Sequence, residues 1–479
     1  MLYIGMFILV AVIAFVAVIL IRTLRFQPRA TEPLEISVES FDKERAITAL
    51  GELVKCKTVS RATHDEEDEA EFEKLYTLLP TLYPHVHESC ELIRFEDRGL
   101  LYHLRGKTEG KPSVLMAHFD VVPVCEELWE KPPFDAVIED GVMWGRGTLD
   151  TKVTFNGILS AADTLIAEGF VPENDVYLAF SGGEEVNGKG ALHIVNYFKE
   201  KGIELSMVVD EGGAVVEKVF PGVKTPCAMV GIAEKGMLNL KYKVASSGGH
   251  ASAPKPHTPV GLLSRACCRV ENHPFPSHIT APVAQMFDTL GRHSTFVYRM
   301  IFANLWCFKG VLDLLAKKSG GDMNALMRTT VAFTQMTGSD APNVIPPTAE
   351  MVSNIRLNPA DTVESAMAYI KKTIGDDGVV LEAANGMNPS RISVTDCEGY
   401  RRVERAISAT WQGCIVSPYL MVQCSDSRHY GTISDKVYRF SAMALTSEER
   451  ATIHGNNERI PLETATKAVE FFIRLMRQC

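Results

Sequence analysis

Three short apolar runs, each ending on a histidine or an acidic residue, constrain the fold of this chain more than any other feature. They lie in the segments 113–118, 176–185 and 206–211. Continuous apolar runs of about 4 to 8 residues between turn-forming residues are typical of strands buried on both faces of a sheet. A helical pattern at residues 155–167 separates the first two runs. We therefore predict an α/β fold with a mixed, mostly parallel sheet flanked by helices.

Each apolar run ends on a side chain of a type that binds metals. In open α/β sheets, ligands bind outside the carboxyl ends of parallel strands, so the three strand ends would converge on one rim. Two further segments carry residues of the same type: a glycine-punctuated turn at 143–152, and a loop at 453–458 before an amphipathic helix. The six residues expected at this rim are His118, Asp150, Glu184, Glu185, Asp210 and His454.

Taken alone, each of these residues has an ordinary structural explanation. The glutamate pair would favour the positive end of a helix dipole, and Asp150 would cap the helix that follows it. Asp210 would begin a turn before two glycines, and His118 would be a hydrogen-bonded core histidine. Their joint occurrence in separated segments favours a metal site, because adjacent like charges require a cation.

The five segments together resemble the dinuclear zinc N-acyl-amino-acid hydrolases and exopeptidases, which include carboxypeptidase S, aminoacylase, carnosinase and the ArgE/DapE deacylases. The resemblance covers residues 45–479 in order. The segments His-x-Asp, Gly-Arg-Gly-Thr-x-Asp, Gly-Gly-Glu-Glu, Asp-Glu-Gly-Gly and Ile-His-Gly-x-Asn-Glu are most similar to the carboxypeptidase S branch. The resemblance implies a zinc-exopeptidase-like domain that holds two Zn²⁺ per subunit, with other divalent metals as alternatives.

The resemblance also implies a role for each residue at the rim. The metal ligands would be Asp150 as the bridge, His118 and Asp210 at one zinc, and Glu185 and His454 at the other. Imidazole and carboxylate are ordinary zinc ligands. Glu184 would act as the general base, and Asp120 would hydrogen-bond the second imidazole nitrogen of His118 and fix its tautomer.

An alternating pattern at residues 238–244 predicts a half-buried strand, which is not typical of the parallel sheet. The resemblance implies a smaller inserted α/β lid domain at 234–357, through which a homodimer would form. The catalytic domain would occupy 43–233 and 358–479.

The lid and the second part of the catalytic domain carry further residues that match the family pattern. His250 would stabilise the oxyanion, and in dimeric relatives this histidine comes from the partner subunit. Asn343 and Arg356 would hold the substrate. Arg428 would bind a carboxylate, because the planar guanidinium can donate two parallel hydrogen bonds.

Residues 296–315 are strongly apolar but contain three charged side chains. They are too interrupted for a membrane span of about 20 residues. The stretch is explained either by helices buried in the lid or by an apolar surface that binds the hydrophobic acyl group of a substrate. In the second case Phe302 and Trp306 would contact the substrate.

The chain begins with an apolar run at residues 2–21 that carries no charge and is followed by three arginines. About 20 such residues span a bilayer, and the run lacks the basic start of a cleaved signal peptide. We predict a single-pass transmembrane anchor at 1–25 and a linker at 26–42. The arginines favour a cytoplasmic enzyme by the positive-inside rule. Carboxypeptidase S relatives face a lumen, so both sides stay open.

The formal net charge of −10 argues against nucleic-acid binding, which favours basic patches. The 11 cysteines are odd in number and form no Cys-x-x-Cys pair, so a disulfide framework is not expected. We predict a membrane-bound zinc hydrolase that cleaves the amide bond of N-acyl amino acids or short peptides with a free C-terminal carboxylate. The alternatives are a dipeptidase that requires a free amino terminus and a non-catalytic binding protein on the same fold.

Overall fold

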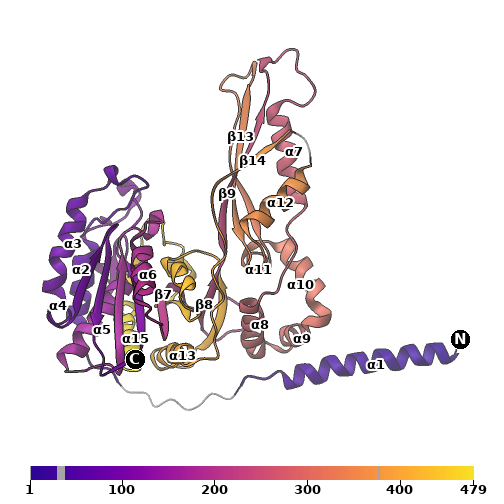
Figure 1. Cartoon of the computed structure of the whole chain (residues 1–479). Helices are drawn as coiled ribbons and strands as arrows, with labels where there is room; N and C mark the ends of the chain where they lie inside the picture. The colour runs from indigo at the N-terminus through magenta and orange to yellow at the C-terminus, as the bar shows by residue number, and fades with distance from the viewer. Residues whose placement is uncertain (1, 30–37, 376–377) are drawn as a thin grey trace.

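A mixed sheet forms the centre of the catalytic domain in a computed structural model that describes residues 2–29, 38–375 and 378–479 (Figure 1). Its eight strands lie in the order β1-β2-β6-β3-β7-β16-β8-β15. The pairs β3–β6, β3–β7, β7–β16 and β8–β15 are parallel, as predicted. The strands are β1 (Glu91–Phe95), β2 (Gly99–Leu104), β3 (Thr108–His118), β6 (Asn174–Ser181), β7 (Met207–Val216), β8 (Cys227–Glu234), β15 (Ile415–Met421) and β16 (Val437–Leu445).

Helices cover both faces of this sheet. Neighbouring residues Val114 and Leu115 of β3 enter different hydrophobic clusters, since successive side chains of a strand point to opposite faces. The cluster that includes Leu115 contains side chains of α5 and α15, and the cluster that includes Val114 contains side chains of α6. The helices of this domain are α2 (Lys43–Val54), α3 (Glu69–Leu82), α4 (Pro84–Ser89), α5 (Lys152–Ala167), α6 (Gly190–Lys201), α13 (Glu398–Thr410), α14 (Ser447–Arg450) and α15 (Leu462–Met476).

Short elements shape the rim of the domain. A three-stranded sheet has the order β17-β5-β4. The short elements are β4 (Val137–Glu139), β5 (Val142–Trp144), β17 (Arg459–Pro461), η1 (His64–Glu66), η2 (Glu126–Leu128), η3 (Glu184–Val186) and η4 (Asp426–Thr432).

The lid stands upright beside the catalytic domain and has its own antiparallel sheet, in the order β11-β13-β9-β14 (Figure 1). Burial alternates along β9, as the sequence predicts. Strand β14 follows residue 357 and pairs with β9, so the lid sheet includes residues beyond the predicted range 234–357. The lid elements are β9 (Gly236–Ala245), β10 (Gly249–His250), α7 (Pro259–Asn272), β11 (Thr330–Thr337), β12 (Val344–Ile345), β13 (Thr348–Leu357), α12 (Val363–Ile374) and β14 (Val380–Met387).

Four helices between α7 and β11 pack away from the lid core. They are α8 (Ala281–His293), α9 (Phe296–Ala303), α10 (Leu305–Ser319) and α11 (Gly321–Met327). The ring centroid of Phe302 is 4.6 Å from that of Phe220 and 5.1 Å from that of Phe287. All three residues belong to the hydrophobic cluster of the catalytic domain. These helices therefore join the base of the lid to the large sheet at the β15 edge.

Helix α1 (Leu2–Arg25) extends from the base of the molecule, crosswise to the long direction of the lid (Figure 1). Its segment Tyr3–Arg25 is long and apolar enough to cross a membrane, a property that a signal sequence shares. Of the predicted linker at 26–42, residues 30–37 lie outside the described residues.

Candidate active site

Strand ends and turns bring acidic and imidazole side chains together at the rim of the large sheet. His118 is the last residue of β3, Glu184 and Glu185 begin η3 after β6, and Asp150 lies just before α5. Among the described residues, the structure contains two groups of three residues, and within each group the ligand atoms all lie within 4.8 Å of one another. One group is His118, Asp150 and Glu185, and the other is His118, Glu184 and Glu211. The convergence that the three apolar runs predict is therefore present.

Asp150 lies between the two histidines. One carboxylate oxygen, Oδ1, is 3.0 Å from His118 Nε2, and the other, Oδ2, is 3.0 Å from His454 Nε2. His454 Nε2 is also 3.0 Å from Glu185 Oε2. A carboxylate with one oxygen toward each of two ligand sets is the arrangement expected of a bridge between two metals.

Asp120 is fully buried and holds both sides of the cluster. Its Oδ1 is 3.3 Å from His118 Nδ1, and the backbone N–H groups of Glu184 and Glu185 donate to its carboxylate at 3.1 and 3.2 Å. Ser60 Oγ donates to it at 2.7 Å. An acceptor at Nδ1 favours the tautomer that leaves His118 Nε2 free to act as a ligand.

Of the two acidic residues in β7, Glu211 rather than Asp210 faces the cluster. Glu211 Oε1 is 3.3 Å from His118 Nε2. The Asp210 carboxylate accepts the backbone N–H of Ser427 at 2.9 Å and belongs to neither ligand group. The register with β16 shifts between Asp210 and Gly213, and such an irregularity changes the direction in which a side chain points. The sequence marks both acids but not this shift.

Glu458, which the sequence marks only as part of a motif, supports the bridge from behind. It is buried, and Arg146 Nη1 lies 2.5 Å from its Oε2. Its Oε1 accepts the backbone N–H groups of Leu149 and Asp150 at 2.7 and 3.1 Å. The turn that presents Asp150 is therefore held by a buried ion pair.

The charges at the rim are unbalanced without a cation. Burial, together with the charges of Glu211 and Glu185, raises the pKa of Glu184 well above its usual value. Burial and the charge of Asp150 raise the pKa of Glu211 to about 8. The Glu185 atom Oε1 is buried and accepts no hydrogen bond from the described residues.

The residues present fit a pair of zinc ions. The donors are imidazole nitrogens and carboxylate oxygens, which are ordinary zinc ligands. The donor atoms that face one another are 3.0 to 3.3 Å apart. Two donors at about 2.0–2.1 Å from one tetrahedral zinc are about 3.3 Å apart. The buried Oε1 atom of Glu185, which accepts no hydrogen bond from the described residues, is a further oxygen that could bind a metal.

The loop before and within η4 links the cluster to the lid. Arg428 Nη2 donates to Asn187 Oδ1 at 3.0 Å, and Asn187 directly follows η3. Arg356 of β13 donates from Nη1 to Cys424 Sγ at 3.6 Å. Both arginines that the sequence predicts to bind the substrate therefore contact segments beside the acidic cluster.

His250 and Asn343 lie together within the lid. His250 pairs with Val344 across the β10–β12 ladder, and the backbone N–H of Ala251 donates to the carbonyl of Asn343. Both residues are exposed. The structure thus brings these two residues to each other, whereas the acidic cluster lies on the catalytic domain.

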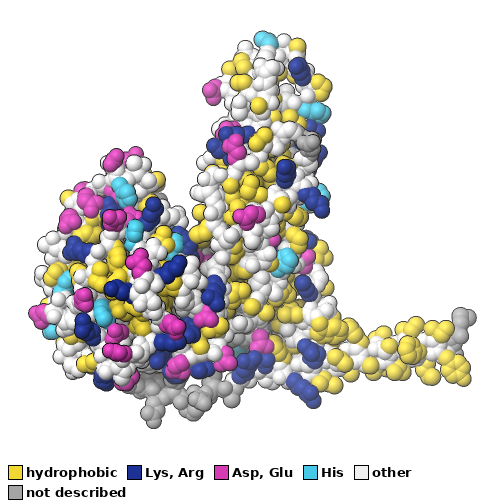
Figure 2. Space-filling model, in the orientation of Figure 1, with side chains coloured by type: hydrophobic (Ala, Val, Ile, Leu, Met, Phe, Trp, Pro, Cys, Tyr) yellow, Lys and Arg dark blue, Asp and Glu magenta, His cyan; other side chains and the backbone are white. Residues whose placement is uncertain are grey.

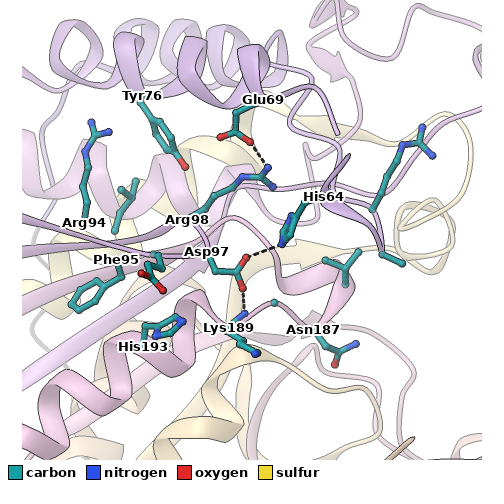
Figure 3. Close-up of a pocket in the computed structure, with 17 residues that line it drawn as sticks. His64, Glu69, Tyr76, Arg94, Phe95, Asp97, Arg98, Asn187, Lys189 and His193 are labelled. Carbon is teal, nitrogen blue, oxygen red and sulfur yellow. Dashed lines mark hydrogen bonds and ion pairs between the residues drawn. The ribbon is translucent and has the colours of Figure 1, made fainter. Parts of the chain in front are cut away.

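A cavity of about 800 Å³ is lined in part by the residues at the end of η3 and just after it (Figure 3). Asn187, Lys189 and His193 line it together with Asp97 and Arg98. The backbone N–H of Lys189 donates to Asp97. The residues that follow Glu185 line the cavity, but none of the predicted ligands does.

Comparisons with known proteins agree with this architecture. The sequence profile of Peptidase family M20/M25/M40 matches residues 114–478. The N-fatty-acyl-amino acid synthase/hydrolase PM20D1 of Xenopus tropicalis is 35% identical over 483 residues, covering 98% of this chain and 93% of that protein. The probable carboxypeptidase S-like 2 of Dictyostelium discoideum is 32% identical over 480 residues, covering 97% and 92%.

Solved structures share the fold at low sequence identity. The M20 family metallo-carboxypeptidase Sso-CP2 from Sulfolobus solfataricus has a TM-score of 0.64 at 18% identity and covers 90% of this chain and 98% of its own. Human carnosine dipeptidase 1 has a TM-score of 0.63 at 14% identity and covers 91% and 96%. The resemblance and the fold predicted from the sequence are confirmed. The chain therefore belongs to peptidase family M20/M25/M40 and is a hydrolytic enzyme.

Proposed function

We propose that this enzyme is a zinc-dependent hydrolase that cleaves the amide bond of N-acyl amino acids or short peptides with a free C-terminal carboxylate. The observation that carries the proposal is Asp150 between His118 and His454, with one oxygen toward each. In this assignment His118, Glu211 and Asp150 would hold one zinc, and Glu185, His454 and Asp150 would hold the other. Glu211 takes the place of the predicted Asp210.

The reaction divides between the metals and the side chains. Two zinc ions, when bound, supply Lewis acidity that polarises the scissile carbonyl and makes water easier to deprotonate. Glu184 accepts the proton of the attacking water and returns it to the leaving amine. Asp120 keeps His118 in the tautomer that binds metal, and it fixes the backbone that carries Glu184 and Glu185.

The substrate carboxylate is assigned to Arg428 and Arg356, whose guanidinium groups suit bidentate binding of carboxylates. Both contact segments beside the cluster. His250 would approach the scissile carbonyl from the lid of a partner subunit in a homodimer, and Asn343, which lies beside it, would hold the substrate. The relatives named for N-fatty-acyl amino acids and for carboxypeptidase S support acylated amino acids and peptides as substrates. Helix α1 is assigned as a membrane anchor.

The catalytic assignment is tested with the Glu184→Gln variant, which keeps the size and most hydrogen bonding of the side chain. Loss of a general base lowers the rate by about 10²–10⁴-fold. We expect the variant to retain the zinc content of the native protein while turnover falls by that factor. Unchanged turnover would refute Glu184 as the general base, whereas a native protein without turnover on any substrate would support a non-catalytic binding protein.

Substrate panels separate the two enzymatic alternatives. N-acyl amino acids, free dipeptides and N-blocked dipeptides are incubated with the native protein, and the products are identified by mass spectrometry. Cleavage of the acylated and blocked compounds supports the proposal. Cleavage of free dipeptides alone would identify a dipeptidase that requires a free amino terminus.

A further inference from the structure

The last turns of α1 are fixed to α9 and α10. The rings of Phe15 and Trp306 meet edge to face, with centroids 5.6 Å apart. The Arg22 guanidinium donates to the carbonyl of Ala303 at 3.1 and 3.2 Å, and Asn304 Nδ2 donates to the carbonyl of Ile19 at 3.2 Å. The position of α9 and α10 relative to α1 is therefore defined by several contacts.

The outer face of α9 and α10 is apolar, although water-facing helices normally present polar side chains there. On α10, Leu312 and Ala316 are buried against the protein, while the opposite side carries exposed apolar residues. The exposed apolar side chains form what we call the α9–α10 surface: Phe296 48%, Val297 62%, Tyr298 42%, Trp306 56%, Val311 53%, Leu314 67% and Leu315 54%. Contiguous apolar patches of this kind mark interaction surfaces.

Neither of the two sequence-based explanations for this stretch describes its environment. Phe302 packs in the core of the catalytic domain, so it is a structural residue. Trp306 packs on α1. The apolar stretch is thus continuous with the apolar helix at the N-terminus, and Figure 2 shows hydrophobic side chains running from α1 onto the base of the upright domain.

Charge distinguishes this region from the rest of an acidic protein. Residues 1–29 and 291–319 contain eight lysines and arginines and one acidic residue, whereas the whole chain carries a formal net charge of −10. The one acid, Asp313, pairs with Lys317 and Arg328. Basic residues beside an apolar, aromatic-containing face favour the surface of an anionic membrane.

The contact with Phe15 sets the depth of the surface. Phe15 lies six residues before Ile21, where the uncharged run ends. A helix rises about 1.5 Å per residue, so Phe15 lies about 9 Å inside the end of the apolar run. Interfacial helices bury their apolar faces by about 5–10 Å. Trp306 would therefore reach the acyl-chain region if α1 crosses the bilayer.

We propose that the α9–α10 surface is inserted into the membrane leaflet in which the C-terminal end of α1 lies, so that the base of the lid rests on lipid. The occupant of the surface is a lipid leaflet. The inference rests on the membrane assignment of α1 in the proposed function, and it extends that assignment from a tether to a second, monotopic contact.

The test uses the full chain in vesicles of phosphatidylcholine and phosphatidylserine, with acyl chains that are either brominated or unmodified. Bromine quenches tryptophan emission on contact. We expect brominated chains to quench the native protein more than the Trp306→Phe variant, which retains the other three tryptophans. Equal fractional quenching of the two proteins would overturn the proposal.

Charged substitutions control for specificity. The double variant Leu314→Glu/Leu315→Glu is expected to lose the quenching that belongs to Trp306. Val380→Glu, at a similarly exposed apolar residue of β14, is expected to keep it. Equal quenching in both variants would contradict insertion of α10. Dimerisation that depends on Leu314 and Leu315, without quenching of Trp306, would identify a second copy as the occupant and also overturn the proposal.

Extraction with alkaline carbonate tests α1 separately, because it removes peripheral proteins but not spanning ones. Protein that resists extraction while Trp306 escapes quenching would refute the α9–α10 surface and retain the anchor. Protein that is extracted while Trp306 is quenched would refute the anchor and retain the surface.

Discussion

Asp210 and Glu211 are neighbours in β7 that differ in what their carboxylates contact. Glu211 approaches His118, whereas Asp210 receives the backbone N–H of Ser427. We expect Glu211→Gln to weaken metal binding by more than about 10-fold, since removing a ligand costs at least as much as removing an outer-shell partner. Asp210→Asn keeps an oxygen acceptor for Ser427 and should retain both metals. Metal content after dialysis against a graded chelator measures the difference, and the reverse order of affinities would restore Asp210 as the ligand.

Most of the rim of the site could be predicted from the sequence, because metal ligands are limited to a few residue types. His118, Asp150, Glu185 and His454 meet as expected. Glu211 could not be separated from Asp210, since the choice depends on a register shift between β7 and β16 that leaves no pattern in the sequence. Glu458 acts through backbone N–H groups, which every residue has, so its contacts are not encoded in a motif.

Strand β8 ends on Glu234, which forms a buried ion pair with Arg439 and accepts hydrogen bonds from Ser425 and Ser427. The element therefore holds the loop that leads to Arg428. Removing one partner of a buried pair leaves an uncompensated charge and costs about 3–5 kcal/mol. We expect Glu234→Ala to lower the free energy of unfolding by that amount in urea denaturation.

Two control variants are compared with Glu234→Ala in the same urea denaturation experiment. The double variant Glu234→Leu/Arg439→Met removes both charges and should recover much of the loss. Glu350→Ala breaks partly exposed ion pairs with Lys241 and Lys243 and should change stability by less than about 1 kcal/mol. A loss at Glu234 no larger than that at Glu350 would contradict a structural role for the buried pair.

Lys235 follows β8 and is buried where the chain enters the lid, with Nζ donating to the carbonyls of Ala325 and Arg328. Burial and the nearby charge of Arg356 lower its pKa to about 7. An unfolded lysine has a pKa of about 10.4, so between the two values the unfolded chain binds one more proton than the folded chain. Stability contributed at this site is therefore present above the unfolded pKa and falls as pH decreases toward 7, by about 1.4 kcal/mol per pH unit.

This pH dependence should disappear in Lys235→Met. We expect the free energy of unfolding of the native protein, relative to that of the variant, to rise with pH between 7.5 and 10. Both proteins are measured by urea denaturation at each pH. Parallel pH profiles would show that Lys235 keeps its proton in the folded state.

The sequence predicts the strands that are buried on both faces of a sheet, but it does not predict the strands and helices that lie at an edge. The apolar runs identify β3, β6 and β7. The runs correspond to the buried C-terminal parts of β3 and β6 and to the buried first residues of β7. Strand β14 is mostly exposed, so its sequence lacks the alternation that reveals β9. Helices α8 to α11 are apolar in pattern, but a pattern does not tell whether the partner is the lid, the catalytic domain or lipid.

The whole molecule separates two sets of residues assigned to one reaction. The acidic cluster lies on the catalytic domain, while His250 is exposed in the lid and contacts lid residues. If His250 acts on the active site of the partner subunit, two differently inactivated chains can complement each other. We expect Glu184→Gln and His250→Ala homodimers to be nearly inactive, and mixtures of the two to regain up to about a quarter of native activity, as random pairing of closed dimers predicts.

Subunit exchange is confirmed by co-purification of differently tagged chains. A mixture that forms tagged heterodimers without regaining activity would place His250 at the site of its own chain. The same measurement made with Arg428→Ala in place of His250→Ala serves as a control, because Arg428 lies beside the cluster of its own chain. Pairing it with Glu184→Gln should restore no activity.

The crosswise direction of α1 relative to the lid has a consequence for such a dimer (Figure 1). Two identical subunits related by a two-fold axis can send both anchors into one bilayer in the same sense only when that axis runs along the membrane normal. The lids would then extend in the plane of the membrane and meet side by side. Pairing of such anchored chains would be a lateral encounter in two dimensions, governed by how many copies share a patch of membrane rather than by their concentration in solution.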